Sequence, residues 1–433
     1  MDEKVANLDK LEETEVKIPN KRSPPKDKYF IAAILLFFLG LVNQLPTHFF
    51  LVASDYWMYK FRDPKNATYD LDHKTYYQKM FISVSLAVPG FPCLLAAYLS
   101  AKFAFRIEVR TRFLMTLGII SFFFVAFTLC IKINTDAWQT EFFVASIFVI
   151  TVISLCHPLY NVTMNAFMSK FPSGLIKMTM YGSAMSGIAS TCLQIFSISI
   201  SHNSTDIAMI YFSLGSVLIL FTLFLCYVMN RSPVVQYYWL EDQGKHVVPS
   251  HTLKDFKNVA VQIWPLILIL VIKISTTGMG HSNITNLVVS QGYEDHKDEL
   301  WYSKYFTPTV TYLGYSIFSL IGRFFGHAYI TRKNSHWFII LTSVRAFVLG
   351  PMFLFCNAQP RHHLPVIFKY DFEYMILLYV YGWSESFIMT THILSTPTMS
   401  GDQSEVAFVL IQVVSNTMST IASFVDPFYV KLL

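Results

Sequence analysis

Long apolar blocks separated by short polar breaks run through almost the whole of this chain, and they constrain its fold more than any other feature. The 433 residues are 53% hydrophobic and only 14% charged, with 39 Phe. A single soluble core cannot bury that much apolar surface. About 20 apolar residues in a helix are enough to cross the ~30 Å hydrocarbon core of a bilayer. The sequence therefore predicts an all-α polytopic membrane protein held in the lipid bilayer.

The apolar blocks predict eleven transmembrane helices. Their expected ranges are about 29–53, 80–101, 113–133, 141–166, 178–200, 206–229, 260–280, 304–330, 337–356, 373–396 and 405–430. Residues 1–28 are charged and are expected to form a disordered cytosolic tail. Residues 230–258 are expected to be a cytosolic linker between an N-terminal six-helix bundle, 29–229, and a C-terminal five-helix bundle, 259–433.

Two features predict the orientation of these spans. The basic tail and the basic loop at 102–112 fall on one side, which the positive-inside rule makes cytosolic. Three glycosylation patterns, at Asn66, Asn203 and Asn283, fall on the opposite side. With eleven spans, the N-terminus is cytosolic and the C-terminus extracellular. The tail has no adjacent leucine pair after an acidic residue, so we expect a multi-pass protein of the plasma membrane.

The sequence lacks the short motifs of soluble enzymes. It contains no Walker loop, no dinucleotide-binding glycine fingerprint after a strand and no HExxH. The six cysteines form no CxxC, so neither a metal site nor a disulfide framework is expected. The net charge of +5 comes from basic residues scattered over loops, so no nucleic-acid partner is expected. We expect no enzyme and no cofactor, and the function must come from polar groups inside the membrane.

The stretch 305–326 carries one such group. It is apolar for most of its length and contains Arg323, with Ser316 and Ser319 at helical spacings of seven and four before it. Those spacings put the three side chains on one face of a helix. A fixed cation on that face marks a cavity or a pathway. Alternatively, Arg323 lies near the cytosolic end of the span and extends to the headgroups.

Two more predicted spans carry polar clusters. The first span contains a proline with polar neighbours: Asn43, Gln44, Pro46, Thr47 and His48. The fourth contains three polar residues at spacings of four: His157, Asn161 and Asn165. A proline frees backbone carbonyls where a solute can approach, and a polar stripe favours a cavity over lipid. The alternative for both is hydrogen bonding between helices.

Charged residues inside the spans are unbalanced. Lys273, Arg323 and Arg345 face a single carboxylate, Glu385. Some of these cations must therefore meet water, carbonyl groups or a solute. Three histidines also fall within the spans: His48, His157 and His392. They are either proton sites or, more commonly, neutral hydrogen-bonded side chains.

Four segments, in order along nearly the whole chain, resemble the equilibrative nucleoside transporter family. LGLVNQLPTHFFLVASDYW (39–57) resembles the family pattern LGxGxLLPWNxFxTAxxYF, and residues 153–187 resemble its fourth and fifth helices. The 305–326 stretch is similar to YFxPxxxFxxFNxFDWxGR, and 351–374 with 403–407 resemble its last three helices. The resemblance implies a 6+5 pseudo-symmetric bundle of the major-facilitator type. It also implies alternating access and facilitated diffusion of nucleosides or nucleobases.

The departures from the family pattern lie at its solute-binding positions. The family's asparagine and aspartate of the eighth helix fall at Ser316 and Ser319, whereas its arginine is kept as Arg323. An acidic residue appears instead in the tenth span, and we hypothesise that Glu385 is the counter-charge of Arg323. The candidate solute-binding residues are Gln44, Thr47, His48, Leu51, Asn161, Ser316, Ser319, Arg323 and Glu385.

Three functions remain open at this point. The first is a facilitative carrier of nucleosides or nucleobases with altered selectivity. The second is a carrier of a different small solute, with an anionic one favoured by Lys273, Arg323 and Arg345. The third is a non-transporting member that binds a ligand or a partner. The sequence predicts no oligomeric state.

Overall fold

The chain forms a bundle of long helices. The computed structural model describes residues 30–65, 75–103, 107–168, 171–201, 203–240, 253–276, 284–293, 295–296, 299–326, 330–359, 361 and 363–432. Within these residues the named elements are helices, and two isolated β-bridges, Val288–Ala358 and Cys356–Phe368, join loop segments. The predicted all-α fold is confirmed.

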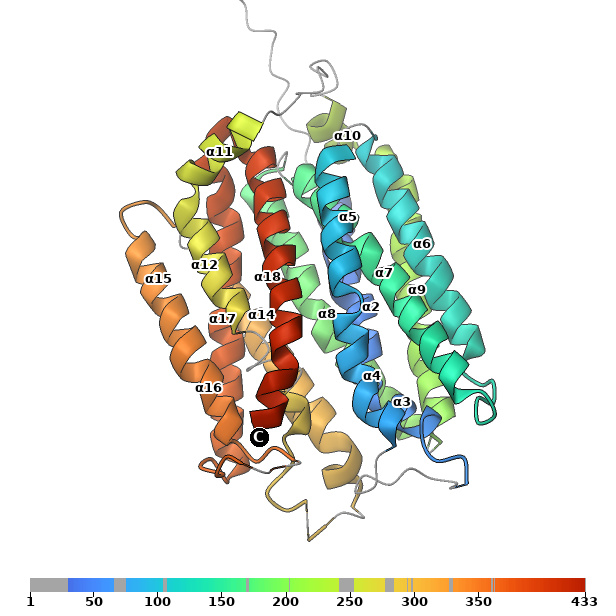
Figure 1. Ribbon diagram of the computed structural model, residues 1–433. Helices are drawn as coiled ribbons and strands as arrows, with labels where there is room; N and C mark the ends of the chain where they lie inside the picture. The colour runs from blue at the N-terminus through green and yellow to red at the C-terminus, as the bar shows by residue number, and fades with distance from the viewer. Residues whose placement is uncertain are drawn as a thin grey trace, which may run out of the picture.

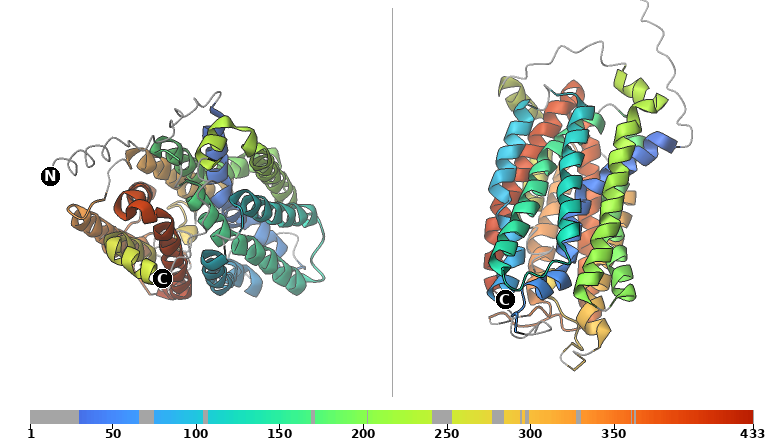
Figure 2. Two further views of the ribbon diagram at one scale, coloured as in Figure 1. Left: turned by 90° about the horizontal axis from the view of Figure 1, so that it is seen from above. Right: turned by 90° about the vertical axis from the view of Figure 1, so that its right-hand side faces the viewer.

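The helices make two neighbouring groups (Figures 1 and 2). The N-terminal helix group consists of α2 (Ile31–Val52), α3 (Ser54–Lys60), α4 (Tyr76–Ala87), α5 (Gly90–Phe103), α6 (Val109–Cys130), α7 (Gln139–Met168), α8 (Ser173–Ile200) and α9 (Ser204–Val228). The C-terminal helix group consists of α11 (Leu253–Gln262), α12 (Trp264–Ser275), the π-helices η6 (Trp301–Tyr305) and η7 (Thr307–Gly314), α14 (Tyr315–Phe325), α15 (Ser335–Val344), the π-helix η8 (Arg345–Leu349), α16 (Gly350–Met352), α17 (Asp371–Ser400) and α18 (Ser404–Leu432). Short 3-10 turns η3 (Met229–Arg231), η5 (Thr285–Leu287), η9 (Phe353–Phe355) and η10 (Gly401–Gln403) and the helix α10 (Pro233–Leu240) complete the described elements.

Length and composition allow six helices of the described chain to cross a membrane. They are Ile31–Val52, Val109–Cys130, Gln139–Met168, Gly174–Ile200, Ser204–Val228 and Ser335–Phe355. A seventh span results if α11 and α12, which are bent by 79° at their junction, are counted together. The other expected spans coincide with helices that are shorter, broken or more polar, namely α4 with α5, η7 with α14, α17, and α18.

The second expected span is divided at a proline. Helix α4 ends at Ala87 and α5 begins at Gly90, with Val88 and Pro89 between them. Proline cannot donate the backbone hydrogen bond that continues a helix. The eighth span also departs from a regular helix, because it starts as two π-helical segments before α14. Such segments occur frequently at functional sites.

Helices α2 and α8 approach each other closely through two glycines. A Cβ atom on Gly182 of α8 would clash with the backbone carbonyl of Phe37 in α2. A Cβ atom on Gly40 of α2 would likewise clash with the backbone carbonyl of Thr179 in α8. Because lipid provides no hydrophobic force between helices, small residues that let backbones touch are a main source of packing energy in membranes. These glycines therefore fix α2 against α8.

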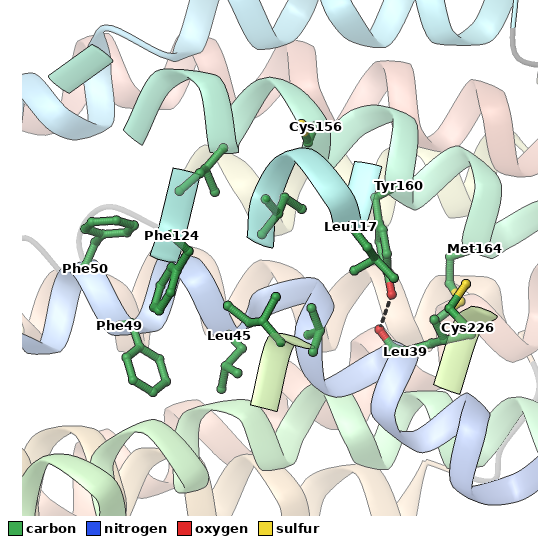
Figure 3. Close-up of a cluster of buried hydrophobic side chains, with 14 of the residues drawn as sticks. Leu39, Leu45, Phe49, Phe50, Leu117, Phe124, Cys156, Tyr160, Met164 and Cys226 are labelled. Atoms are coloured by element: carbon green, nitrogen blue, oxygen red, sulfur yellow. Dashed lines mark hydrogen bonds between the residues drawn. The ribbon is translucent and has the colours of Figure 1, made fainter. Parts of the chain in front are cut away.

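An aromatic core holds the N-terminal helix group together. Phe49 of α2 stacks on Tyr211 of α9 with ring centroids 4.2 Å apart and meets Phe124 of α6 edge-to-face at 5.6 Å. Figure 3 shows Phe49, Leu45 and Phe124 in this cluster, and Tyr160 of α7, whose hydroxyl donates to the Leu39 carbonyl at 2.6 Å. This bond satisfies a polar group that would otherwise be buried without a partner. The core leaves the opposite faces of α2 and α7 available for a cavity.

The two ends of the bundle differ. Helices α10 and α11 lie at one end, whereas α3, α16 and the C-terminus lie at the other (Figure 1). The range 230–258 expected as a linker contains α10 and the start of α11, and residues 241–252 lie outside the described part. At the α3 end, Arg62 binds Asp136 through both of its terminal nitrogens, at 3.1 and 3.2 Å. Lys60 donates to the Ile133 carbonyl there at 2.6 Å.

Candidate functional site: a central polar cavity

A cavity of about 630 Å³ lies between the two helix groups. This volume is within the ~300–1,000 Å³ range of small-molecule sites. Its wall takes residues from α2, α5, α7 and α8 on one side and from α12, α14, α17 and α18 on the other. All nine candidate residues from the sequence line it: Gln44, Thr47, His48, Leu51, Asn161, Ser316, Ser319, Arg323 and Glu385. Residues far apart in the chain thus converge on one space.

Helix α2 presents one continuous face to the cavity. Gln44, Thr47, His48 and Leu51 are spaced by three, four and seven residues, which puts them on one side of a helix. Pro46, inside α2, also lines the cavity. Gly187 of α8 lies opposite, where an added Cβ would be 3.8 Å from the His48 ring. The polar face predicted from the first span is therefore a cavity wall.

Helix α7 contributes a hydrogen-bonded polar stripe. His157, Asn161 and Asn165 all line the cavity. The Asn43 amide donates to the Asn161 side-chain oxygen at 2.9 Å, and the Asn161 amide contacts His157 Nδ1 at 3.1 Å. The sequence left two interpretations of this stripe open, a cavity wall and hydrogen bonding between helices. Both are correct, because Asn161 joins α2 to α7 and also faces the cavity. The bonds also fix which way the Asn161 amide points.

Helix α14 places its predicted polar face on the cavity. Ser316 and Ser319 are buried, and Arg323 lies one turn beyond Ser319. The Ser319 hydroxyl is hydrogen-bonded to the Ser386 hydroxyl of α17. Arg323 Nη1 donates to the backbone carbonyl of Met180 in α8 at 2.6 Å. Arg323 thus crosses from the C-terminal to the N-terminal helix group, so the interpretation that it extends to the headgroups is wrong.

The predicted direct pairing of Glu385 with Arg323 is also wrong. The Glu385 carboxylate instead accepts from Arg345 at 2.8 Å, contacts the Lys273 ammonium at 3.2 Å and accepts from the Tyr315 hydroxyl at 2.6 Å. The Arg345 guanidinium is 1% exposed and lies over the Tyr381 ring at 3.9 Å. These groups come from α12, α14, η8 and α17. Only the tertiary packing of those helices decides which cation reaches the carboxylate.

Sequence reasoning missed one wall of the cavity, which belongs to α18. Its contribution is a row of polar side chains: Gln412, Ser415, Asn416, Ser419 and Thr420. Their spacing of three, four, seven and eight residues was a readable signal for a polar face. Lys273 was noted in the sequence but not placed among the candidates, and it also lines the cavity. His392 lines it as well, with its Nε2 donating to the Leu266 carbonyl at 3.0 Å.

Comparison with solved structures identifies the fold. The chain matches a proton:xylose symporter, XylE, bound to 6-bromo-6-deoxy-D-glucose, with a TM-score of 0.61, 12% identity, and coverage of 93% of this chain and 89% of that one. It matches a mutant of the nucleoside transporter NupG with a TM-score of 0.53, 12% identity, and coverage of 91% and 90%. The symporter is described as a member of the major facilitator superfamily. The fold is therefore of the major-facilitator type, as predicted.

Sequence comparison identifies the family within that class. The nucleoside transporter family model matches residues 147–415, which is more than half of the chain. Equilibrative nucleoside transporter 3 of Rattus norvegicus is 26% identical over 405 residues, covering 86% of this chain and 83% of that protein. Equilibrative nucleoside transporter 1 of Homo sapiens is 22% identical, covering 84% and 89%. The chain belongs to the nucleoside transporter family.

Proposed function

We propose that this protein carries nucleosides or nucleobases across a membrane by facilitated diffusion, and that it is a carrier and not an enzyme. The observation that carries the proposal is the polar cavity of about 630 Å³ whose wall is shared by both helix groups of a nucleoside transporter family member. A solute bound between two helix groups can be exposed to either side in turn when the groups rock against each other. The six-helix region 29–229 and the five-helix region 259–433 would be the two moving parts.

The chemistry of the wall suits a nucleobase. Gln44 and Asn161 have amides that donate and accept, which matches the mixed donor and acceptor edge of a base. Thr47, Ser316 and Ser319 offer hydroxyl groups, which can meet either kind of group. Leu51, His48, Arg323 and Glu385 complete the proposed set with an apolar surface, an aromatic ring and two charged groups.

Uptake measurements test this function directly. Radiolabelled uridine, adenosine and adenine are offered to nucleoside-transport-null cells that express the protein, with surface expression measured in parallel. Saturable uptake of at least one of them supports the proposal. The absence of uptake of all three, and of the charged analogues orotate and uridine 5′-monophosphate, overturns it when the protein is confirmed at the surface. Uptake that equilibrates with the outside concentration and is unaffected by collapsing ion gradients supports facilitated diffusion.

We further propose a plasma-membrane location with the N-terminus in the cytosol and the C-terminus outside. Asn203 is exposed at the start of α9, next to Asp206, whose carboxylate contacts Lys132 at 2.9 Å. That segment lies near α3, at the end where the chain terminates (Figure 1). A sugar on Asn203 would therefore mark the outer face. Asn66 and Asn283, the other two predicted glycosylation sites, lie outside the described residues.

Glycosidase treatment tests the orientation. In the proposed arrangement, removal of N-linked sugars increases the gel mobility of the full chain. Asn203→Gln alone reduces the size of that shift. The matched control is Asn230→Gln, since Asn230-Arg231-Ser232 is the same kind of acceptor pattern on the predicted cytosolic side. A shift that depends on Asn230 instead of Asn203 would reverse the orientation.

A further inference from the structure

The charges on the cavity wall are unbalanced in favour of positive charge. Among the described lining residues, Lys273 and Arg323 are cationic, and Glu385 is the only carboxylate. Arg345, just behind the wall, adds a third positive charge. Inside a membrane such an excess is costly because there is little water to screen it.

The single carboxylate is already engaged by cations other than Arg323. Both of its oxygens are in contact with cations: Oε1 with Lys273 at 3.2 Å and Oε2 with Arg345 at 2.8 Å. Oε2 also accepts from Tyr315 at 2.6 Å. Glu385 therefore forms its ion pairs with Lys273 and Arg345, and none is formed with Arg323.

Arg323 has no carboxylate within ion-pair distance among the described residues. The Arg323 guanidinium has five N–H donors. One of them, on Nη1, donates to the Met180 carbonyl. The Nε donor is buried without a hydrogen-bond partner. The residues one and two turns before it on α14 are Ser319 and Ser316, which are neutral. Ser319 is in turn bonded to Ser386. The cavity face of α14 thus presents a guanidinium with an unpaired Nε donor and, among the described residues, no carboxylate within ion-pair distance.

From this geometry we propose that the cavity prefers nucleobases or nucleosides that carry an oxyanion, which Arg323 binds. The proposal rests on the proposed transport function and specifies its substrate class. A guanidinium binds an oxyanion through two parallel, charge-assisted hydrogen bonds, which are roughly twice as strong as neutral ones. A neutral base gains no such contact. The oxyanion is either a carboxylate on the base or a phosphate on the ribose, since both present a pair of charged oxygens to the guanidinium.

Binding to the purified full-length protein tests this preference without requiring transport. Orotate is compared with uracil, which is the same ring without the carboxylate. Uridine 5′-monophosphate is compared with uridine in the same way, and the two pairs separate the two sources of the oxyanion. We expect the anionic member of at least one pair to bind about tenfold more tightly or better, because a hydrogen bond to a charged group contributes that much. Neutral members that bind as tightly as their anions overturn the proposal.

Two variants show whether the preference comes from Arg323. Arg323→Gln should bring the affinity of the anion down to that of its neutral partner. The matched control is Arg332→Gln, which removes an equal charge from an exposed loop position. Ser319→Asp should also abolish the preference, because it places a carboxylate one helical turn from Arg323. Ser319→Asn has a side chain of the same shape as Ser319→Asp but without charge, so it should keep the preference for the anion. If both variants show the same preference for the anion, the proposal is contradicted.

The outcomes separate this inference from the proposed function. Uptake of uridine or adenine without any anion preference in binding retains the transport function and overturns the inference. Anion-selective binding that depends on Arg323, with no uptake of any nucleoside, nucleobase or anion, retains the inference about the cavity and overturns the transport function. Uptake of orotate or the nucleotide that is lost in Arg323→Gln supports both.

Discussion

Arg345 and Glu385 form an ion pair at 2.8 Å in the interior of the C-terminal helix group, with the Arg345 side chain 1% exposed. The guanidinium also lies 3.9 Å from the Tyr381 ring, so its planar face is covered. The pair joins η8 to α17, and Lys273 of α12 joins it from a third helix. Removing Glu385 takes away the carboxylate that both cations contact.

We predict that Glu385→Gln destabilises the protein strongly. Breaking a buried ion pair on one side costs about 3–5 kcal/mol, because the remaining charge stays desolvated. The unfolding midpoint of the purified protein in detergent should fall accordingly. The double variant Glu385→Gln with Arg345→Gln should be less destabilised than the sum of the two single variants. A single variant as stable as the unmodified protein would show that the pair contributes little.

The close contact of α2 with α8 gives a second prediction. Gly182→Ala should reduce stability and surface expression, because its Cβ would meet the backbone carbonyl of Phe37, which cannot move without shifting the helix. Gly118→Ala is the matched control, since nothing lies within 4 Å of its added Cβ. It should leave stability unchanged or raise it by about 0.5–1 kcal/mol through better helix propensity. Equal thermal stability of the two variants would contradict the close packing of α2 on α8.

Cys93 gives a third prediction, about access to the cavity. It lines the cavity on α5, whereas Cys130 and Cys192 are exposed elsewhere on the described surface. A small, negatively charged methanethiosulfonate reagent should therefore inhibit most of the uptake by modifying Cys93. Cys93→Ser should make uptake resistant to the reagent, and a high concentration of transported solute should protect the unmodified protein. Cys192→Ser should stay sensitive, and resistance in that variant instead would place the reactive thiol outside the cavity.

A pH dependence of stability follows from Lys60 of α3, which lies beyond the first span. Burial lowers the pKa of Lys60 to about 8, below the ordinary value of 10.5. Between these two values the unfolded chain binds more protons than the folded one, so stability should rise as the pH increases through this window. The unfolding midpoint measured at several pH values from about 7 to 10 should show this rise, and Lys60→Met should flatten it. If the unfolding midpoint rises equally in the unmodified protein and in Lys60→Met, the rise comes from titratable groups other than Lys60.

Much of the cavity was readable from helical spacing. Gln44, Thr47, His48 and Leu51 form one face because a helix repeats every 3.6 residues, and the same rule places Ser316, Ser319 and Arg323 together. The polar residues of α18 show the same helical spacing, but the sequence did not predict them as a cavity wall. Serine, threonine and asparagine side chains also form hydrogen bonds between membrane helices, so a polar face alone does not indicate a cavity. Spacing identifies a polar face but does not tell which neighbour that face meets.

The sequence by itself determined that this chain is a helical membrane protein and which faces of its helices are polar. Both properties are local, since they follow from the length of an apolar block and from the period of a single helix. The tertiary structure decided the partners: Glu385 pairs with Arg345 and Lys273, while Arg323 reaches the Met180 carbonyl. The pairing of these charges depends on how helices distant in the chain pack. The attraction of a cation to a carboxylate falls with their separation, and the sequence alone does not give that separation.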